Sequence, residues 1–267
     1  MSAPPTWPAG AASDDADGEF DAWTLAVPVP DVGTLIVRYA VVVEPGVPQP
    51  PATDTPSPRA RAGDARVVAG FFVPAADASI GIERRFPLAA VVGDGVTTVA
   101  IGPDRLHRTG ARGATAGGGH ELTWDLRWAE LPLAVRTAPA WHRAIGLAQP
   151  HRRGVAPSMR VDGTIVVDGR RHTIHQVAAT LDHAWGQHHA SRWAVARCAT
   201  FAERPDVALE ACAWRPRLGR MPAPPVTVVR LTIGDERIAL DDLRHLPRNR
   251  ARWDNGVIAV LAAHRDG

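Results

Sequence analysis

The chain has 267 residues, of which 45% are hydrophobic, and this is enough for two domains of ordinary size or for one large barrel. Its formal net charge of +2 creates no field that would attract nucleic acid or an anionic membrane surface. All 30 basic residues are arginine, so a Schiff-base lysine and a P-loop lysine are excluded.

The first 19 residues are small, polar and proline-bearing, which predicts a disordered tail. They have neither the basic start nor the apolar core of a signal peptide, and no later stretch approaches the length of a membrane span. We therefore expect a cytoplasmic protein without a transmembrane segment. Cys198 and Cys212 should then be reduced and buried, unless their strands pair in a register that permits a disulfide.

Apolar and polar residues alternate with a period of two along most of the chain, and this alternation predicts β-strands. Residues 34–43 form one β-branched run. In residues 121–128 the apolar side chains share one strand face, namely Leu122, Trp124, Leu126 and Trp128. Turn dipeptides between such runs predict hairpins at Asp168-Gly169, Gly234-Asp235 and Asn255-Gly256.

Three segments interrupt the strand pattern. Residues 45–64 hold six prolines, and residues 110–119 are mostly glycine and alanine, so we expect a loop in each. Residues 138–150 are the best candidate for a short helix or crossover. They divide the chain into an N-terminal β domain over residues 20–137 and a C-terminal β domain over residues 138–267.

Residues 181–201 concentrate acidic, imidazole and indole side chains, namely Asp182, His183, Trp185, His188, His189 and Trp193. We expect residues 177–182 to form a strand that ends at Asp182, with Trp185-Gly186 in the following turn. A carboxyl group beside an imidazole can move protons, and neighbouring indoles would raise the pKa of the carboxyl by excluding water. A structural alternative stays open, in which Asp182 and His183 form a turn pair and Trp193 is a core residue.

Metal ligation is not expected. His172 and His175 point to opposite faces of one predicted strand, and the remaining histidines lack the spacing of zinc ligands. His188 and His189 lie in a polar loop, where solvent exposure is the first expectation and a place on a pocket rim the second. Without a P-loop or dinucleotide fingerprint, we expect no metal and no organic cofactor.

The sequence Asp-His-x-Trp-Gly at residues 182–186, with the polar loop and the Trp-led strand that ends at Phe201, resembles the signature of the carotenoid 1,2-hydratase (hydroxyneurosporene synthase) family and its lipocalin-like relatives. It is also similar to the tocopherol cyclases, and residues 157–174 fit the hairpin that precedes the motif in both families. The resemblance implies an all-β fold of two consecutive lipocalin-like antiparallel barrel or sandwich domains with little helix.

The resemblance also implies a reaction. An acid at Asp182 would protonate a C=C bond, and water or an internal nucleophile would capture the cation. His183 would orient the acid or deprotonate the water, and indole faces would stabilise the cation. The chain would then be a cofactor-independent hydratase or cyclase, a lyase or isomerase acting on an isoprenoid, steroid or polyketide.

A non-catalytic lipocalin-like carrier of a small hydrophobic ligand is the alternative function. In either case the chain has one tyrosine and five phenylalanines, too few for one barrel to enclose a long ligand, so we expect the ligand between the two domains. The predicted ligand-binding residues are Trp185, Trp193, His188, His172, Trp124 and Trp128.

Overall fold

The computed structural model describes residues 19–43, 63–73, 79–93, 98–129, 135–136, 151–186, 192–215, 217–218, 221–222, 224–242, 244–245, 247–254 and 257–261. Within these residues every regular element except one short 3-10 turn, Leu88–Ala90, is a β-strand. The chain divides into two compact units, which we call unit 1 (residues 1–132 and 160–177) and unit 2 (residues 133–159 and 178–267). The predicted all-β fold class is therefore confirmed.

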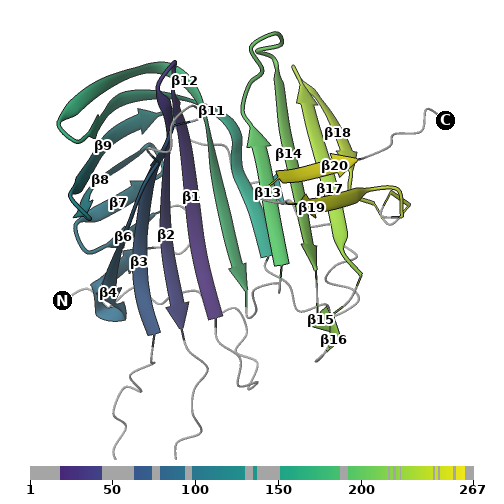
Figure 1. The fold of residues 1–267 in the computed structure, drawn as a ribbon, viewed down its shortest axis with the longest axis horizontal. Coiled ribbons are helices and arrows are strands. Elements are labelled where there is room, and N and C mark those ends of the chain that lie inside the picture. Colours follow the sequence, from purple (N-terminus) through teal and green to yellow (C-terminus); the bar gives the residue numbers. More distant parts are fainter. Residues whose placement is uncertain are drawn as a thin grey trace, which may run out of the picture. The chain divides into compact units, whose positions relative to one another are not determined.

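Unit 1 is built on most of one long antiparallel sheet, of which residues 135–136, 151–159 and 178–186 belong to unit 2. Its strands lie in the order β4-β3-β2-β1-β12-β11-β9-β8-β7-β6-β5, and those from β4 to β6 are labelled in Figure 1. The strand bounds are β1 Glu19–Val29, β2 Gly33–Val43, β3 Gly63–Phe72, β4 Ile80–Pro87, β5 Val91–Gly93, β6 Val99–Ile101, β7 Asp104–His107, β8 Gly110–Gly117, β9 His120–Trp128, β11 His151–Val167 and β12 Arg170–Gly186. The short strand β10, Val135–Arg136, pairs with β11.

The sheet of unit 1 curls into a nearly closed barrel. Arg84 on β4 donates from Nη1 to the carbonyl of Ala114 on β8 at 2.7 Å, which joins one end of the sheet to a strand near the other end. Trp124 Nε1 on β9 donates to Tyr39 Oη on β2 at 3.1 Å. Since β1, β12 and β11 separate these two strands in the sheet, the bond crosses the interior of the barrel.

Side chains fill that interior. The largest of those with less than 2% exposure in unit 1 come from β1, β2, β6, β7, β9, β11 and β12, and they include Trp23, Leu25, Tyr39, Leu106 and Trp124. On β9 the alternation of buried and exposed residues agrees with the prediction for residues 121–128. Burial of one face of each strand therefore drives the fold of unit 1.

The loop predicted over residues 110–119 is wrong. Residues 110–117 form strand β8, which pairs along its whole length with β9, and the turn is confined to Gly118 and Gly119, where φ is +62° and +84°. Packing explains why β8 contains small residues. A Cβ on Gly113 would lie 2.3 Å from Trp124 Cζ2 and 2.4 Å from Asp104 Oδ1, so glycine makes room for both side chains.

The hairpin predictions are confirmed where the structure describes them. Asp168 and Gly169 both have positive φ in the turn between β11 and β12, and Gly234 does so between β17 and β18. Asn255-Gly256, residues 45–62, residues 138–150 and the first 18 residues lie outside the described residues. The predicted domain boundary near residue 138 falls there too, and it stays a prediction.

Unit 2 contains a four-stranded antiparallel sheet in the order β13-β14-β17-β18. Its strands are β13 Arg192–Cys198, β14 Val207–Arg215, β17 Val226–Ile233 and β18 Glu236–Leu240. Two small hairpins accompany the sheet, β15 Arg217–Leu218 with β16 Met221–Pro222, and β19 Arg250–Asp254 with β20 Val257–Leu261. None of the described segments forms a helix that is long and apolar enough to cross a membrane.

Candidate functional site

Strand β12 carries Asp182 and His183, the two residues predicted to be catalytic. The strand continues to Gly186, so the prediction that it ends at Asp182 and turns at Trp185 is wrong. Residues 178–183 are all buried. A strand that is buried on both faces shows no alternation of polar and apolar residues. The sequence pattern therefore predicted a strand that is too short at this end.

The side chains of Asp182 and His183 point to opposite faces of β12, because they are consecutive in a strand. The two residues are 3% and 4% exposed, respectively. The His183 ring stacks on Trp185, with ring centroids 4.7 Å apart and an interplanar angle of 30°. Asp182 instead approaches Arg197 on β13. The described contacts thus place the acid beside a guanidinium and the imidazole on an indole, and the catalytic roles of both residues stay predictions.

Asp182 belongs to a row of alternating charges. Arg197 Nη2 lies 2.6 Å from Asp182 Oδ1 and donates to Glu210 Oε1 at 2.9 Å. Glu210 Oε2 in turn lies 3.9 Å from Arg230 Nη1, and Arg230 Nε donates to Asp241 Oδ2 at 2.9 Å. We call these five residues the charged row.

Strand register builds the centre of the charged row. Arg197 on β13 is directly opposite Glu210 on β14, and Glu210 is directly opposite Arg230 on β17. Directly opposed residues share a sheet face, where charges of opposite sign attract across neighbouring strands. The exposed fractions of the five side chains run from 4% for Asp182 to 19% for Arg230.

Removing these charged side chains from water has a free-energy cost, which makes the charged row a poor way to stabilise the fold alone. Taking a carboxylate and a guanidinium out of water costs several kcal/mol per ion, about as much as their attraction returns. Apolar residues of similar volume would hold these strands together as well or better. Buried ionisable groups that are kept in spite of this cost are candidates for a functional site.

An apolar cluster lies beside the charged row on the same sheet face. Cys212 and Trp214 follow Glu210 at intervals of two on β14, while Val228 precedes Arg230 by two on β17. Cys212, Trp214 and Val228 pack together with Val195 and Val226. This face of unit 2 therefore combines an apolar surface that contains an indole with paired carboxylates and guanidiniums.

The two cysteines do not bond to each other, although they lie on neighbouring strands. In the register of β13 with β14, Val195 is opposite Cys212 and Cys198 is opposite Leu209. The thiols are thus offset along the sheet. Cys198 Sγ donates to the Thr200 carbonyl at 2.8 Å instead.

Of the remaining predicted ligand-binding residues, three belong to unit 1 and two to unit 2. Trp124 and Trp128 are 1% and 6% exposed within unit 1, where Trp128 Nε1 donates to the Arg108 carbonyl at 2.9 Å. His172 stacks on Phe71 in the same unit, with ring centroids 6.1 Å apart. In unit 2, Trp193 is opposite Trp214 in register, but its side chain is outside the described part, as is His188. Ligand contact by these residues stays a prediction.

Metal binding finds no support in the described residues, among which no three His, Cys, Asp or Glu side chains converge on one point. The chemistry that the charged row can perform is proton transfer by a carboxyl group and stabilisation of a negative oxygen by a guanidinium.

Comparison of the whole chain with solved structures finds similar β folds. A provisionally assigned AttH protein from Nitrosomonas europaea superposes with a TM-score of 0.54 at 15% identity, over 97% of this chain and 81% of the other. The fold is lipocalin-like. Kievitone hydratase from Nectria haematococca has a TM-score of 0.49 at 11% identity, with 97% and 76% of the chains covered.

CghA in complex with Sch210972 has a TM-score of 0.42 at 10% identity, with 83% of this chain and 59% of CghA covered. By sequence, no known protein family matches the chain, and neither does any curated protein. At these identities the likeness establishes the lipocalin-like fold and nothing about the reaction.

Unit 1 holds a second buried acid, Asp104 on β7, which sequence reasoning missed. It is 0% exposed, its Oδ1 accepts the Ala114 N–H at 3.0 Å, and its Oδ2 lies 3.7 Å from Arg84 Nη1. Burial raises the pKa of this carboxyl, while the Ala114 N–H and the guanidiniums of Arg84 and Arg105 oppose the shift. A single acid two residues after a glycine gives no signal of such burial.

The raised pKa of Asp104 predicts how its effect on stability depends on pH. The neutral carboxyl is favoured in the fold, so its contribution is complete below the ordinary value of 3.8 and is lost as the pH rises through the folded pKa. Urea titrations at a series of pH values should therefore show Asp104→Asn gaining stability relative to the natural chain as pH increases.

Asp168→Asn is the matched control, because the Glu121 N–H, followed by His120, lowers the pKa of that exposed carboxyl. Its stabilising contribution is present above 3.8 and lost as the pH falls, so the pH dependence should have the opposite sign. Parallel profiles for the two variants would contradict the assignment of Asp104.

Proposed function

We propose that the protein is an enzyme that hydrates, cyclises or isomerises a C=C bond of an apolar natural product, an isoprenoid, steroid or polyketide, by proton transfer through Asp182. The observation that supports this proposal is the charged row, partly withdrawn from solvent beside the apolar cluster on one face of unit 2. A surface that only holds an apolar ligand has no need of paired carboxylates and guanidiniums, whose desolvation is costly.

The contact with Arg197 favours an order of proton transfers that differs from the one implied by the family resemblance. A guanidinium 2.6 Å from Asp182 Oδ1 favours the ionised carboxylate over the neutral acid. Asp182 then acts first as a base, on water or on a C–H group of the substrate, and afterwards returns the proton to carbon. Hydration, cyclisation and isomerisation can each be completed by one such group.

His183 has a supporting part in this proposal. It stacks on Trp185, two residues further along the same strand, on the face of β12 opposite to Asp182, and this contact would stiffen the segment that carries Asp182. The imidazole does not need to reach the substrate to do this.

The same ion pair favours one alternative, a non-catalytic carrier. Arg197 would then neutralise Asp182 permanently, and the charged row would only orient a polar group of the ligand. The enzyme transfers protons to or from the bound compound, whereas the carrier does not.

The test is incubation of the natural chain in D2O with a panel of isoprenoid, steroid and polyketide alkenes, followed by mass spectrometry. Hydration places solvent deuterium on carbon, whereas cyclisation or isomerisation gives a product that differs from the alkene in structure, and either result in at least one compound class supports the enzyme. If compounds of the panel quench the tryptophan fluorescence but none gains carbon-bound deuterium or changes structure, the carrier function is supported instead.

A further inference from the structure

The guanidinium of Arg197 meets its two described partners through one of its three nitrogens. Its two carboxylate partners, Asp182 and Glu210, both approach the same nitrogen, Nη2. Among the residues that the structure describes, none accepts a hydrogen bond from Nε or Nη1 of Arg197. The side chain keeps 14% of its surface exposed, and the strand register places it on the same sheet face as the apolar cluster.

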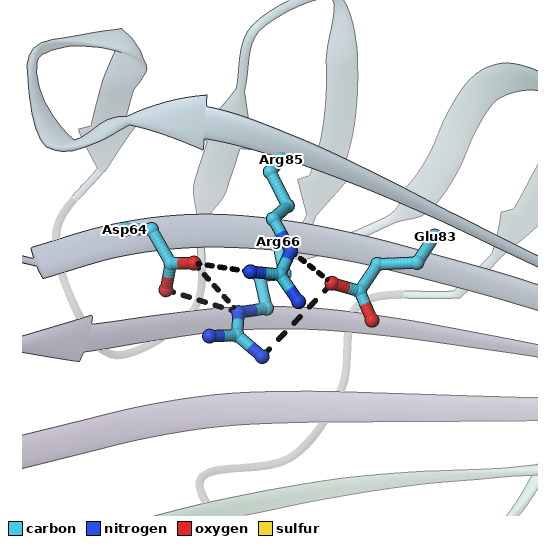
Figure 2. Close-up of polar contacts among 4 residues, drawn as sticks. All are labelled: Asp64, Arg66, Glu83 and Arg85. Carbon is cyan, nitrogen blue, oxygen red and sulfur yellow. Dashed lines mark hydrogen bonds and ion pairs between the residues drawn. The ribbon is translucent and has the colours of Figure 1, made fainter.

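Arg66 in unit 1 shows the contrasting case. It also lies between two carboxylates, but Nε donates to both oxygens of Asp64 at 3.0 and 2.9 Å, and Nη1 lies 3.9 Å from Glu83 (Figure 2). Arg85 completes this group, since its Nε donates to Glu83 at 2.5 Å. Arg66 is 33% exposed, and its Nε and Nη1 both contact carboxylates of the protein, as expected of a structural ion pair on the surface.

Two carboxylates fix the guanidinium of Arg197 in place while its other donors stay available. A fixed cation that offers N–H groups beside an apolar surface is suited to an oxygen that is, or becomes, negatively charged. Arginine stays charged at all relevant pH values, so it stabilises such an oxygen without a proton transfer of its own.

We propose that Arg197 binds a carbonyl oxygen of the substrate through Nε or Nη1, and that the reacting C=C bond is conjugated to this carbonyl. This rests on the proposed function and narrows its substrate class to apolar α,β-unsaturated carbonyl compounds. Arg197 is then a catalytic residue, and Glu210 is a positioning residue that acts through it.

The reaction balances without a further reactant. For hydration, Asp182 takes a proton from water while the water oxygen bonds to the β carbon, and the π electrons of the C=C bond move onto the carbonyl oxygen. Arg197 stabilises the resulting enolate. The enolate then forms a C–H bond at the α carbon with the proton held by Asp182, which leaves a β-hydroxy carbonyl product and the original carboxylate.

The probe for this site is 2-naphthol, whose ionised form carries an oxyanion on a flat apolar frame, with naphthalene as the matched compound without oxygen. We expect the natural chain to bind 2-naphthol more tightly than naphthalene. We also expect the absorption of bound naphtholate at pH values where the free probe in water is protonated. A bound probe that stays protonated there overturns the proposal, and this measurement needs no variant.

Replacing Arg197 tests whether this residue causes the tight binding and the ionisation of 2-naphthol. Arg197→Gln should weaken 2-naphthol binding about 10- to 100-fold, the range for a charge-assisted hydrogen bond, and abolish the naphtholate band, with naphthalene binding unchanged. If this variant fails to fold, Arg197→Gln combined with Glu210→Gln removes both charges of the pair together. Arg66→Gln is the matched control and should bind both probes as the natural chain does.

The outcomes separate this inference from the proposed function. If 2-naphthoate binds through Arg197 and 2-naphthol does not, the site recognises carboxylates and the carbonyl proposal is overturned. If deuterium enters only alkenes without a carbonyl group, the proposed function stands and this inference fails. Arg197-dependent naphtholate formation without any turnover supports the oxyanion site and contradicts the enzyme.

Discussion

Asp182→Asn should lower the rate of deuterium incorporation from D2O by about 10²- to 10⁴-fold, the usual contribution of a positioned acid–base group. The amide has nearly the shape of the carboxylate and keeps an oxygen beside Arg197 Nη2. It cannot take up a proton from water or from carbon. The loss should appear in kcat rather than in KM, because the substituted group acts on the transition state.

The stability of this variant should change little. Arg197 keeps its hydrogen bond to Glu210 at 2.9 Å, so removing the Asp182 charge does not leave a buried guanidinium alone. Asp64→Asn is the control, because Asp64 also pairs with an arginine but lies in the surface group of unit 1. An Asp182→Asn protein that is folded and turns over its substrate at the natural rate would remove Asp182 from the mechanism.

The sequence predicted those strands whose faces differ in polarity. Residues 121–128 alternate cleanly, and β9 buries exactly the apolar half of this pattern within unit 1. The alternation of polar and apolar residues does not reveal a strand that is buried on both faces. It also does not reveal a strand made mostly of glycine and alanine. The first case is the end of β12 around Asp182, and the second is β8, whose glycines and alanines resemble a loop but pack against Trp124.

The motif in residues 181–201 identified Asp182 as a candidate site residue, but it did not identify the residues that pair with it. Arg197, Glu210 and Arg230 lie on three strands and meet only through the register of β13, β14 and β17. Arg230 is the single charge of β17, while Arg197 and Glu210 each share a largely apolar strand with one terminal arginine. Such isolated charges of alternating sign in successive strands are a usable signal, but pairing must be known before they can be joined into a row.

Trp124→Ala should destabilise the protein by about 3–5 kcal/mol, as large-to-small substitutions of buried aromatic residues do. Trp124 is 1% exposed, and its Nε1 bond to Tyr39 Oη joins two walls of the unit 1 barrel. Tyr39 keeps its bond to the Arg105 carbonyl at 3.2 Å, so the loss comes mainly from the cavity and the missing apolar contacts. Val92→Ala, at a position that is 58% exposed, should change the free energy of unfolding by less than about 0.5 kcal/mol.

Gly113 provides an independent check of this packing. In the natural chain Gly113→Ala should destabilise unit 1, because its Cβ would lie 2.3 Å from Trp124 Cζ2. In the Trp124→Ala background that conflict is gone, although the contact with Asp104 Oδ1 at 2.4 Å remains. Urea titrations of the two single variants and the double variant should therefore give a double-variant loss smaller than the sum of the single losses. Strict additivity would show that Gly113 and Trp124 do not touch, and that the indole does not fill the barrel as described.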